Sequence, residues 1–331
     1  MIKVVIDRDI PFLEGLLEPY AQVTQLEGRA ISAADVRDAD ALVIRTRTRC
    51  DARLLQGSRV KTVVTATIGT DHIDSRWCRD NGIEVFNAAG CNARGVLQWV
   101  AAVLVQSVHG RGLDPRQLTL GVVGVGNVGS LVERYARIWG FNVICCDPPR
   151  EEREHCGFLP VEEIFRRADI VTLHVPLDDS TYHLADSRML SLRKGGMLIN
   201  ASRGEVADTR ALADSDKLLA LDVWENEPRI DRTLAERALT ATPHIAGYSL
   251  QGKANASAAA VEILARKYSL PLAGWYPRGV KRTVPQPIAW QELCSSIASH
   301  YDIEADSHAL KSHPERFEEL RNGYRYREEY F

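Results

Sequence analysis

The chain has 331 residues, with 41 Lys and Arg against 44 Asp and Glu, a formal net charge of −3 and a hydrophobic fraction of 45%. This length is enough for two domains of roughly 150 residues. The balanced charge, without blocks of like charge, argues against binding to nucleic acid or to a membrane surface through bulk charge, and a composition with 23 Gly and 14 Pro is that of a globular protein rather than a disordered one.

The N-terminus and the cysteines indicate a reducing compartment. Residues 1–7 form an apolar run that is too brief for a signal peptide, so we interpret them as a strand of a cytoplasmic protein. The most apolar stretch, residues 96–105, is far shorter than the roughly 20 residues that cross a bilayer. The seven cysteines form no C-x-x-C pair and no Cys/His cluster, so we expect reduced thiols and no metal site.

Short apolar runs alternate with amphipathic stretches up to about residue 250, which predicts βαβ units and parallel sheets. In the first part of the chain we expect a helix around Phe12, Leu13, Leu16 and Leu17. The predicted strands there are residues 2–6, 41–44, 60–66 and 83–86. This pattern predicts a small, open, flavodoxin-like α/β domain.

A second α/β domain follows a linking helix at residues 92–109, for which Asn92 is the expected N-cap. Its predicted strands are residues 120–123, 143–146, 170–174, 197–200 and 218–223, and its predicted helices are residues 128–139 and 161–167. A helix at 251–268 returns to the first domain. We therefore assign residues 1–92 and 249–268 to the first domain, 93–248 to the second, and 269–331 to a short C-terminal module whose charged helical stretch begins at Pro314.

The strongest motif is Gly124-Val-Gly126-Asn-Val-Gly129, which follows a predicted strand and opens a predicted helix. In this context the glycines permit a tight turn, close approach of a pyrophosphate, and close packing of helix on strand. Asp147 ends the next strand, where a carboxylate binds a ribose diol and repels a 2′-phosphate. The second domain is therefore a Rossmann domain that favours NAD, although Arg150 leaves open the acceptance of a 2′-phosphate.

Three further residues follow predicted strand ends: Arg203, Glu227 and His244. Strand carboxyl ends meet at the ligand crevice of such a sheet. An arginine holds a carboxylate bidentately, a histidine takes a hydroxyl proton, and a carboxylate orients the imidazole. The trio thus suits hydride transfer at a hydroxy acid, whereas each residue alone also fits a surface ion pair, a solvated turn or a structural histidine.

The motifs 124–129, 200–204, 222–228 and 243–247, in this order, resemble those of the D-isomer-specific 2-hydroxyacid dehydrogenase family. The resemblance implies two α/β domains flanking a cleft, with Arg203, Glu227 and His244 as catalytic residues. The NAD contacts that we expect are Gly124, Gly126, Asn127, Val128, Gly129, Asp147, Val175, Ala201, Asp222 and Gly247.

Within the family, the segments around Asp7, Thr67, Cys91 and His244 imply NAD-dependent oxidation of 4-phospho-D-erythronate to 2-oxo-3-hydroxy-4-phosphobutanoate, in pyridoxal phosphate biosynthesis. The implied substrate contacts are Thr46, Thr67 and Tyr248, although the threonines also fit ordinary turns. The C-terminal module implies a homodimer. Two rival hypotheses remain: a sibling enzyme acting on 3-phosphoglycerate or glycerate, and a non-catalytic protein that senses NAD.

A phosphorylated substrate also needs a cation. Arg45, Arg47 and Arg49 alternate, so they would share one side if the preceding strand continued. We expect at least one of them, with Arg45 as the candidate, to face the phosphate, while a solvated edge is the alternative. The sequence departs from the family in the shortened segment between Arg203 and Glu227, in Ile68, and in the short C-terminus.

Overall fold

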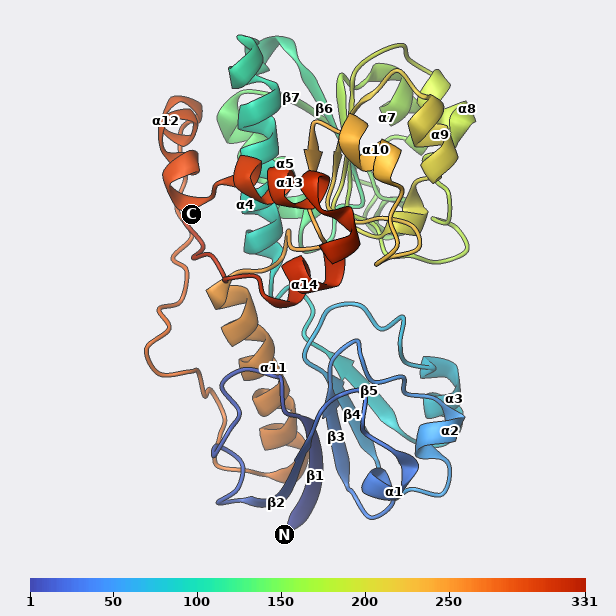
Figure 1. Ribbon diagram of the computed structural model, residues 1–331, viewed down its shortest axis with the longest axis vertical. Helices are drawn as coiled ribbons and strands as arrows, with labels where there is room; N and C mark the ends of the chain where they lie inside the picture. Colours follow the sequence, from blue (N-terminus) through green and yellow to red (C-terminus); the bar gives the residue numbers. More distant parts are fainter. The chain divides into compact units, whose positions relative to one another are not determined.

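The computed structural model describes residues 1–331 and divides into two compact units. Unit 1 comprises Met1–Asn92 and Leu250–Arg282, and unit 2 comprises Ala93–Ser249 and Thr283–Phe331. Figure 1 shows both units, with most of their helices and strands labelled. The C-terminal part, which the sequence suggested as a third module from residue 269 onward, is divided between the two units because its helices pack into the core of unit 2.

Unit 1 is a five-stranded parallel sheet in the order β2-β1-β3-β4-β5. This is the flavodoxin-like order. The strands are β1 (Ile2–Asp7), β2 (Ala21–Leu26), β3 (Ala41–Ile44), β4 (Thr62–Thr65) and β5 (Glu84–Asn87). Helix α11 (Leu250–Tyr268) packs on one face of the sheet, and α1 (Ala33–Val36), α2 (Ala52–Leu55) and α3 (Ser75–Asp80) pack on the other.

The prediction of a helix around Phe12 is wrong. Residues 8–20 form successive turns, because Phe12 and Gly15 have positive φ angles of 67° and 73°. The buried side chains of Leu13 and Leu17 nevertheless join the core under α11. Strand β2 was not predicted, since it is an edge strand with mixed burial and too few apolar residues to give a pattern.

Unit 2 is a six-stranded parallel sheet in the order β11-β10-β9-β8-β6-β7. It confirms the predicted Rossmann fold. Its strands are β6 (Thr119–Val123), β7 (Asn142–Cys146), β8 (Ile170–Leu173), β9 (Met197–Asn200), β10 (Leu218–Leu221) and β11 (Thr240–Ala241). Its helices before the C-terminal segment are α4 (Ala93–Ser107), α5 (Gly129–Trp139), α6 (Pro148–Glu154), α7 (Val161–Arg167), α8 (Ser187–Ser191), α9 (Thr209–Asp214) and α10 (Arg232–Arg237).

Successive side chains along the strands of unit 2 point to opposite faces of the sheet, and each face has its own hydrophobic core. Val122 points to the core that contains α4 and α5, whereas Val123 points to the core that contains α7 to α10. Helix α4 begins at Ala93, close to the predicted position. The prediction of Asn92 as its N-cap is wrong, because the Oδ1 atom of Asn92 is buried and accepts no hydrogen bond from the first turn of the helix.

The C-terminal segment contributes helices α12 (Trp290–His300), α13 (Ile303–Ser312) and α14 (Phe317–Asn322) to unit 2. The charged helical stretch predicted from Pro314 onward is helical mainly in the six residues of α14. Leu310 and Phe317 enter one core of the unit, and Phe331 enters the other. These three buried side chains make the segment an integral part of unit 2.

All seven cysteines are free, and four of them are buried. None of the helices combines the length and the apolar character that a membrane span requires.

Candidate active site

The glycine loop connects β6 to α5 as the motif predicts. Gly124 has φ of +86°, and a Cβ atom there would lie 2.6 Å from the carbonyl oxygen of His174. A Cβ atom at Gly129 would lie 1.9 Å from the carbonyl oxygen of Gly124, so only glycine lets α5 start here. Gly126, by contrast, is exposed, and a Cβ atom added there would have no other atom within 4 Å. Neither backbone strain nor packing requires glycine at 126, which fits a cradle left free for a pyrophosphate.

Asp147 stands at the end of β7 and faces this loop. Its Oδ2 accepts a hydrogen bond of 2.8 Å from the backbone N–H of Val125, and its Oδ1 accepts one of 3.0 Å from that of Arg150. The guanidinium of Arg150 is paired with Glu154 at 2.6 Å and donates to the carbonyl of Val125. The carboxylate is thus presented beside the loop while the nearby cation is already neutralised, which favours NAD over NADP. Val175, just after β8, also borders Gly124.

The loop that carries Arg203 follows β9 and is shaped by Asn200. The Asn200 side chain donates to the carbonyl of Arg203 at 2.9 Å and accepts from the hydroxyl of Ser202 at 2.8 Å. A Cβ atom at Gly204 would lie 2.1 Å from the backbone carbon of Trp224. The Arg203 loop and the loop after β10 are therefore in direct backbone contact, although the segment between them is short.

Glu227 and His244 form a hydrogen-bonded pair. The Oε2 atom of Glu227 lies 2.8 Å from Nδ1 of His244, and Oε1 accepts a hydrogen bond of 2.9 Å from the backbone N–H of Trp224. Burial alone would raise the pKa of the Glu227 carboxyl, but the nearby His244, Arg321 and the Trp224 N–H outweigh burial and hold that pKa below its usual value. The Nε2 atom of His244 is not used by this pair, and the side chain is 29% exposed.

Asp222 organises the backbone around His244. Its Oδ1 accepts from the Thr242 hydroxyl at 2.6 Å and from the Ile245 N–H at 2.8 Å, and its Oδ2 accepts from the Ala246 N–H at 2.9 Å. Burial raises the pKa of this carboxyl, and these hydrogen bonds together with His244 oppose the rise. The Asp222 side chain, predicted as an NAD contact, thus holds the turn in which His244 adopts φ of 57°.

Tyr248 lies on the same loop and meets a residue that sequence reasoning missed. Nε of Arg321, on α14, donates to the Tyr248 hydroxyl at 3.2 Å, and its terminal nitrogen lies 3.7 Å from Oε2 of Glu227. No motif marks Arg321, because it sits among many other charged residues of the C-terminal segment.

In unit 1, the predicted substrate residues follow the ends of neighbouring strands. Thr46 follows β3 and is exposed, and Thr67 follows β4, with its hydroxyl 2.6 Å from that of Thr65. Arg45 donates to the buried Asp7 at 3.0 Å and to Asp9 at 2.7 Å. Strand β3 ends at Ile44, so the alternation expected for the three arginines of this segment does not arise.

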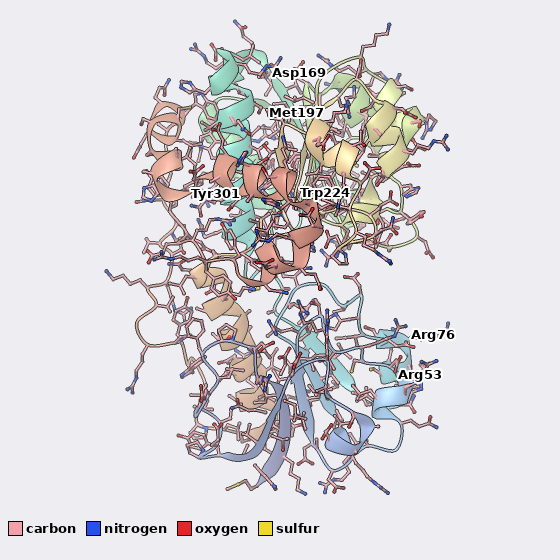
Figure 2. All side chains as sticks on the ribbon, viewed as in Figure 1. Arg53, Arg76, Asp169, Met197, Trp224 and Tyr301 are labelled. Carbon is pink, nitrogen blue, oxygen red and sulfur yellow. The ribbon has the colours of Figure 1, made fainter.

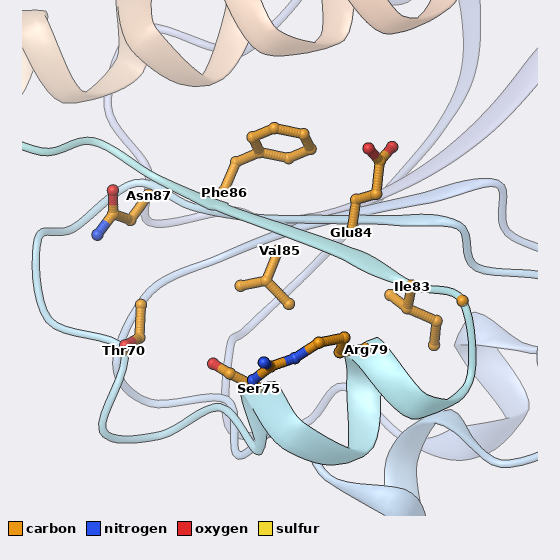
Figure 3. Close-up of a pocket in the computed structure, with 9 residues that line it drawn as sticks. Thr70, Ser75, Arg79, Ile83, Glu84, Val85, Phe86 and Asn87 are labelled. Atoms are coloured by element: carbon orange, nitrogen blue, oxygen red, sulfur yellow. The ribbon is translucent and has the colours of Figure 1, made fainter.

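One cavity of the structure lies away from these residues. It has a volume of about 690 Å³ and lies along the edge strand β5 in unit 1. Figure 3 shows Val85 and Phe86 on opposite faces of this strand, with Val85 on the side of Arg79. The catalytic candidates lie instead in unit 2, which contains the Trp224 labelled in Figure 2.

Comparison with known proteins places the chain in a family. Residues 93–246 match the family described as D-isomer specific 2-hydroxyacid dehydrogenase, NAD binding domain. Erythronate-4-phosphate dehydrogenase of Bacteroides fragilis is 44% identical over 347 aligned residues, covering 99% of this chain and 97% of the relative. The chain belongs to the erythronate-4-phosphate dehydrogenase family. The enzyme of that name from Pseudomonas syringae pv. tomato is 42% identical, with 82% of this chain and 74% of the relative covered.

Solved structures agree on the fold. The TT0316 protein of Thermus thermophilus is 27% identical, with a TM-score of 0.68, and the match covers 81% of this chain and 97% of that one. The NAD⁺-bound 3-phosphoglycerate dehydrogenase of Entamoeba histolytica is 24% identical, with a TM-score of 0.69 and coverage of 87% and 99%. Unit 2 is the NAD-binding part of a 2-hydroxyacid dehydrogenase.

Proposed function

We propose that the protein oxidises 4-phospho-D-erythronate at C2 with NAD, giving 2-oxo-3-hydroxy-4-phosphobutanoate for pyridoxal phosphate biosynthesis. The observation that carries this proposal is the contact of 2.8 Å between His244 Nδ1 and Glu227 Oε2. It leaves Nε2 of His244 free to accept a proton, as the reaction requires. The names of the relatives support the choice of substrate.

The chain's own residues supply binding and proton transfer. His244 accepts the C2 hydroxyl proton at Nε2, and Glu227 holds the ring through Nδ1 and stabilises the imidazolium that forms. Arg203 binds the C1 carboxylate and the carbonyl that develops at C2. NAD, when bound, takes the hydride that leaves C2. The reaction is balanced, because the substrate loses one hydride and one proton.

We assign the cofactor to the glycine loop and the neighbouring strand ends. Gly126 leaves room for the pyrophosphate and Asp147 accepts the ribose hydroxyls, since its carboxylate faces the loop. The remaining proposed contacts are Gly124, Asn127, Val128, Gly129, Val175, Ala201, Asp222 and Gly247.

Thr46, Thr67 and Tyr248 are the proposed substrate contacts. Arg45 is retained as the proposed phosphate ligand, although Asp7 and Asp9 offset its charge. Arg47 and Arg49 must therefore be tested alongside Arg45 as alternative phosphate ligands. Neutral substitutions of each arginine should identify the phosphate ligand through a rise in the KM for the phosphorylated substrate. We also propose that the protein acts as a homodimer in the cytoplasm, and light scattering of the purified protein tests the dimer.

The experiment that tests the function is an assay of NADH formation with three separate substrates: 4-phospho-D-erythronate, 3-phosphoglycerate and D-glycerate. A 2-oxoacid acceptor is added in parallel, in case reduced cofactor stays bound. A preference for the erythronate ester supports the proposal. A preference for another acid would keep the mechanism but change the substrate, and NAD binding without any turnover would favour the sensor hypothesis.

A further inference from the structure

The C-terminal helix α14 brings the cation of Arg321 to the catalytic pair. Glu227 Oε2, the atom that accepts from His244, also lies 3.7 Å from a terminal nitrogen of Arg321. At this distance the arginine acts on the carboxylate electrostatically rather than through a hydrogen bond. Oε2 therefore keeps its hydrogen bond to His244 while it also faces the positive charge of Arg321.

Arg321 also fixes the phenol of Tyr248. Its Nε donates to the Tyr248 hydroxyl at 3.2 Å, so one guanidinium touches both Glu227 and a proposed substrate contact. Its side chain is 26% exposed, which lowers the screening of these contacts by water. The ring of Tyr248 is further held by Tyr324 and Tyr326, with centroid distances of 6.2 and 6.1 Å.

The segment that carries Arg321 is firmly attached to the catalytic loop. Phe317, at the start of α14, is 1% exposed in the core of unit 2. Beyond α14, the buried Arg327 donates to the carbonyl of Ile245 at 3.1 Å and to that of Ala246, and its backbone pairs with Ser249. The C-terminal segment thus contacts the loop on both sides of Tyr248, within unit 2.

We propose that Arg321 is a positioning residue for the dehydrogenase reaction: it fixes the Glu227 carboxylate and the Tyr248 phenol, and it keeps the charge of the Glu227–His244 pair balanced. The proposal rests on the proposed function of this site. It gives the C-terminal segment a role in catalysis besides any role in assembly.

The charges around the pair determine the expected pH effect. Glu227 faces His244 and Arg321, and His244 faces Glu227 and, through its turn, the buried Asp222. Without the Arg321 cation, less positive charge offsets the negative charges of Glu227 and Asp222. This change favours the protonated form of the His244 imidazole. Because oxidation needs a neutral His244, the acidic limb of the pH profile of kcat/KM should then lie at higher pH.

The test compares Arg321→Met, Arg321→Lys and the control Arg325→Met, which removes an exposed arginine of the same segment. We expect Arg321→Met to lower kcat about 10-fold to 100-fold and to shift the acidic limb upward. Arg321→Lys should recover part of both effects, and Arg325→Met should match the wild type. Tm and NAD affinity should stay close to those of the wild type in all three. An unchanged kcat and pH profile in Arg321→Met would overturn the proposal, as would a loss of activity that only parallels a loss of Tm.

The comparison uses whichever of the three acids the wild type oxidises, so a wrong substrate does not prevent the test. If the wild type oxidises none of the three acids, the ¹⁵N spectrum of the His244 imidazole tests the proposed role of Arg321 instead. Signals that change in Arg321→Met and not in Arg325→Met support the proposal, and identical signals in both variants overturn it.

Discussion

Nδ1 of His244 and Oε2 of Glu227 lie 2.8 Å apart although the two residues are 17 positions apart in the chain. The loops after β10 and β11 bring them together, because these strands are parallel neighbours whose carboxyl ends share one edge of the sheet. The pair is therefore a product of the sheet topology, and it forms despite the shortened segment that precedes β10.

The charge of Glu227 is predicted to matter for catalysis. Glu227→Gln removes the negative charge that stabilises the imidazolium, while the shape of the side chain is kept. We expect kcat to fall about 10-fold to 1,000-fold with little change in NAD affinity. Steady-state kinetics and NADH fluorescence titration measure the two quantities, and a fully active variant would remove Glu227 from the mechanism.

The glycine loop gives a prediction that separates folding from cofactor binding. Gly129→Ala places a Cβ atom 1.9 Å from the Gly124 carbonyl oxygen, so we expect a loss of about 3 kcal/mol or more in the free energy of unfolding. Gly126→Ala meets no atom within 4 Å and should leave stability within about 0.5 kcal/mol. It should still weaken NAD binding about 10-fold or more, since the methyl group occupies the space of the pyrophosphate. Equal Tm losses in both variants would refute this division of roles.

Asp147 is predicted to set the cofactor preference. Asp147→Asn retains an acceptor for the N–H of Val125 but removes the charge that repels a 2′-phosphate. The ratio of kcat/KM for NAD to that for NADP should fall about 10-fold or more. Activity with each cofactor is the measurement, and Glu151→Gln on the same helix is the control. An unchanged ratio would assign the selectivity elsewhere.

Much of this site follows from the sequence, because the motifs at 124–129 and 200–204 each sit at the end of a strand that its apolar run predicts. The motif at 243–247 follows β11, whose two residues, Thr240 and Ala241, form no apolar run. The sequence could not reveal the contact of Arg321 with Glu227, since the contact depends on how the C-terminal segment packs. Nor could the sequence predict the turns at residues 8–20. Leu13 and Leu17 have the spacing of a helix, but they are buried in the core of unit 1 by a segment that forms turns. In both cases tertiary packing overrides the local pattern.

The C-terminal segment also predicts a pH dependence of stability. Burial raises the pKa of Asp306 to about 6, although this carboxylate accepts a hydrogen bond of 3.0 Å from Tyr324. A raised pKa in the folded state means that the protein loses stability as pH rises through about 6. Asp306→Asn should therefore stabilise the protein at pH 7.5 by about 1 to 3 kcal/mol, and the gain should vanish near pH 4.

Thermal unfolding at several pH values tests this dependence. Asp38→Asn, at an exposed aspartate, is the matched control. If Asp306→Asn instead lowered Tm at pH 7.5, the carboxylate would be a stabilising partner of the buried Arg327.

The most direct test of the central claim is the rate of NADH formation from 4-phospho-D-erythronate by the wild type and by His244→Ala. We expect turnover by the wild type, a decrease in kcat of about 10²-fold to 10⁴-fold in the variant, and similar NAD affinities in both. Equal kcat values, or a variant that differs only in NAD affinity, would contradict the role of His244 as the proton acceptor.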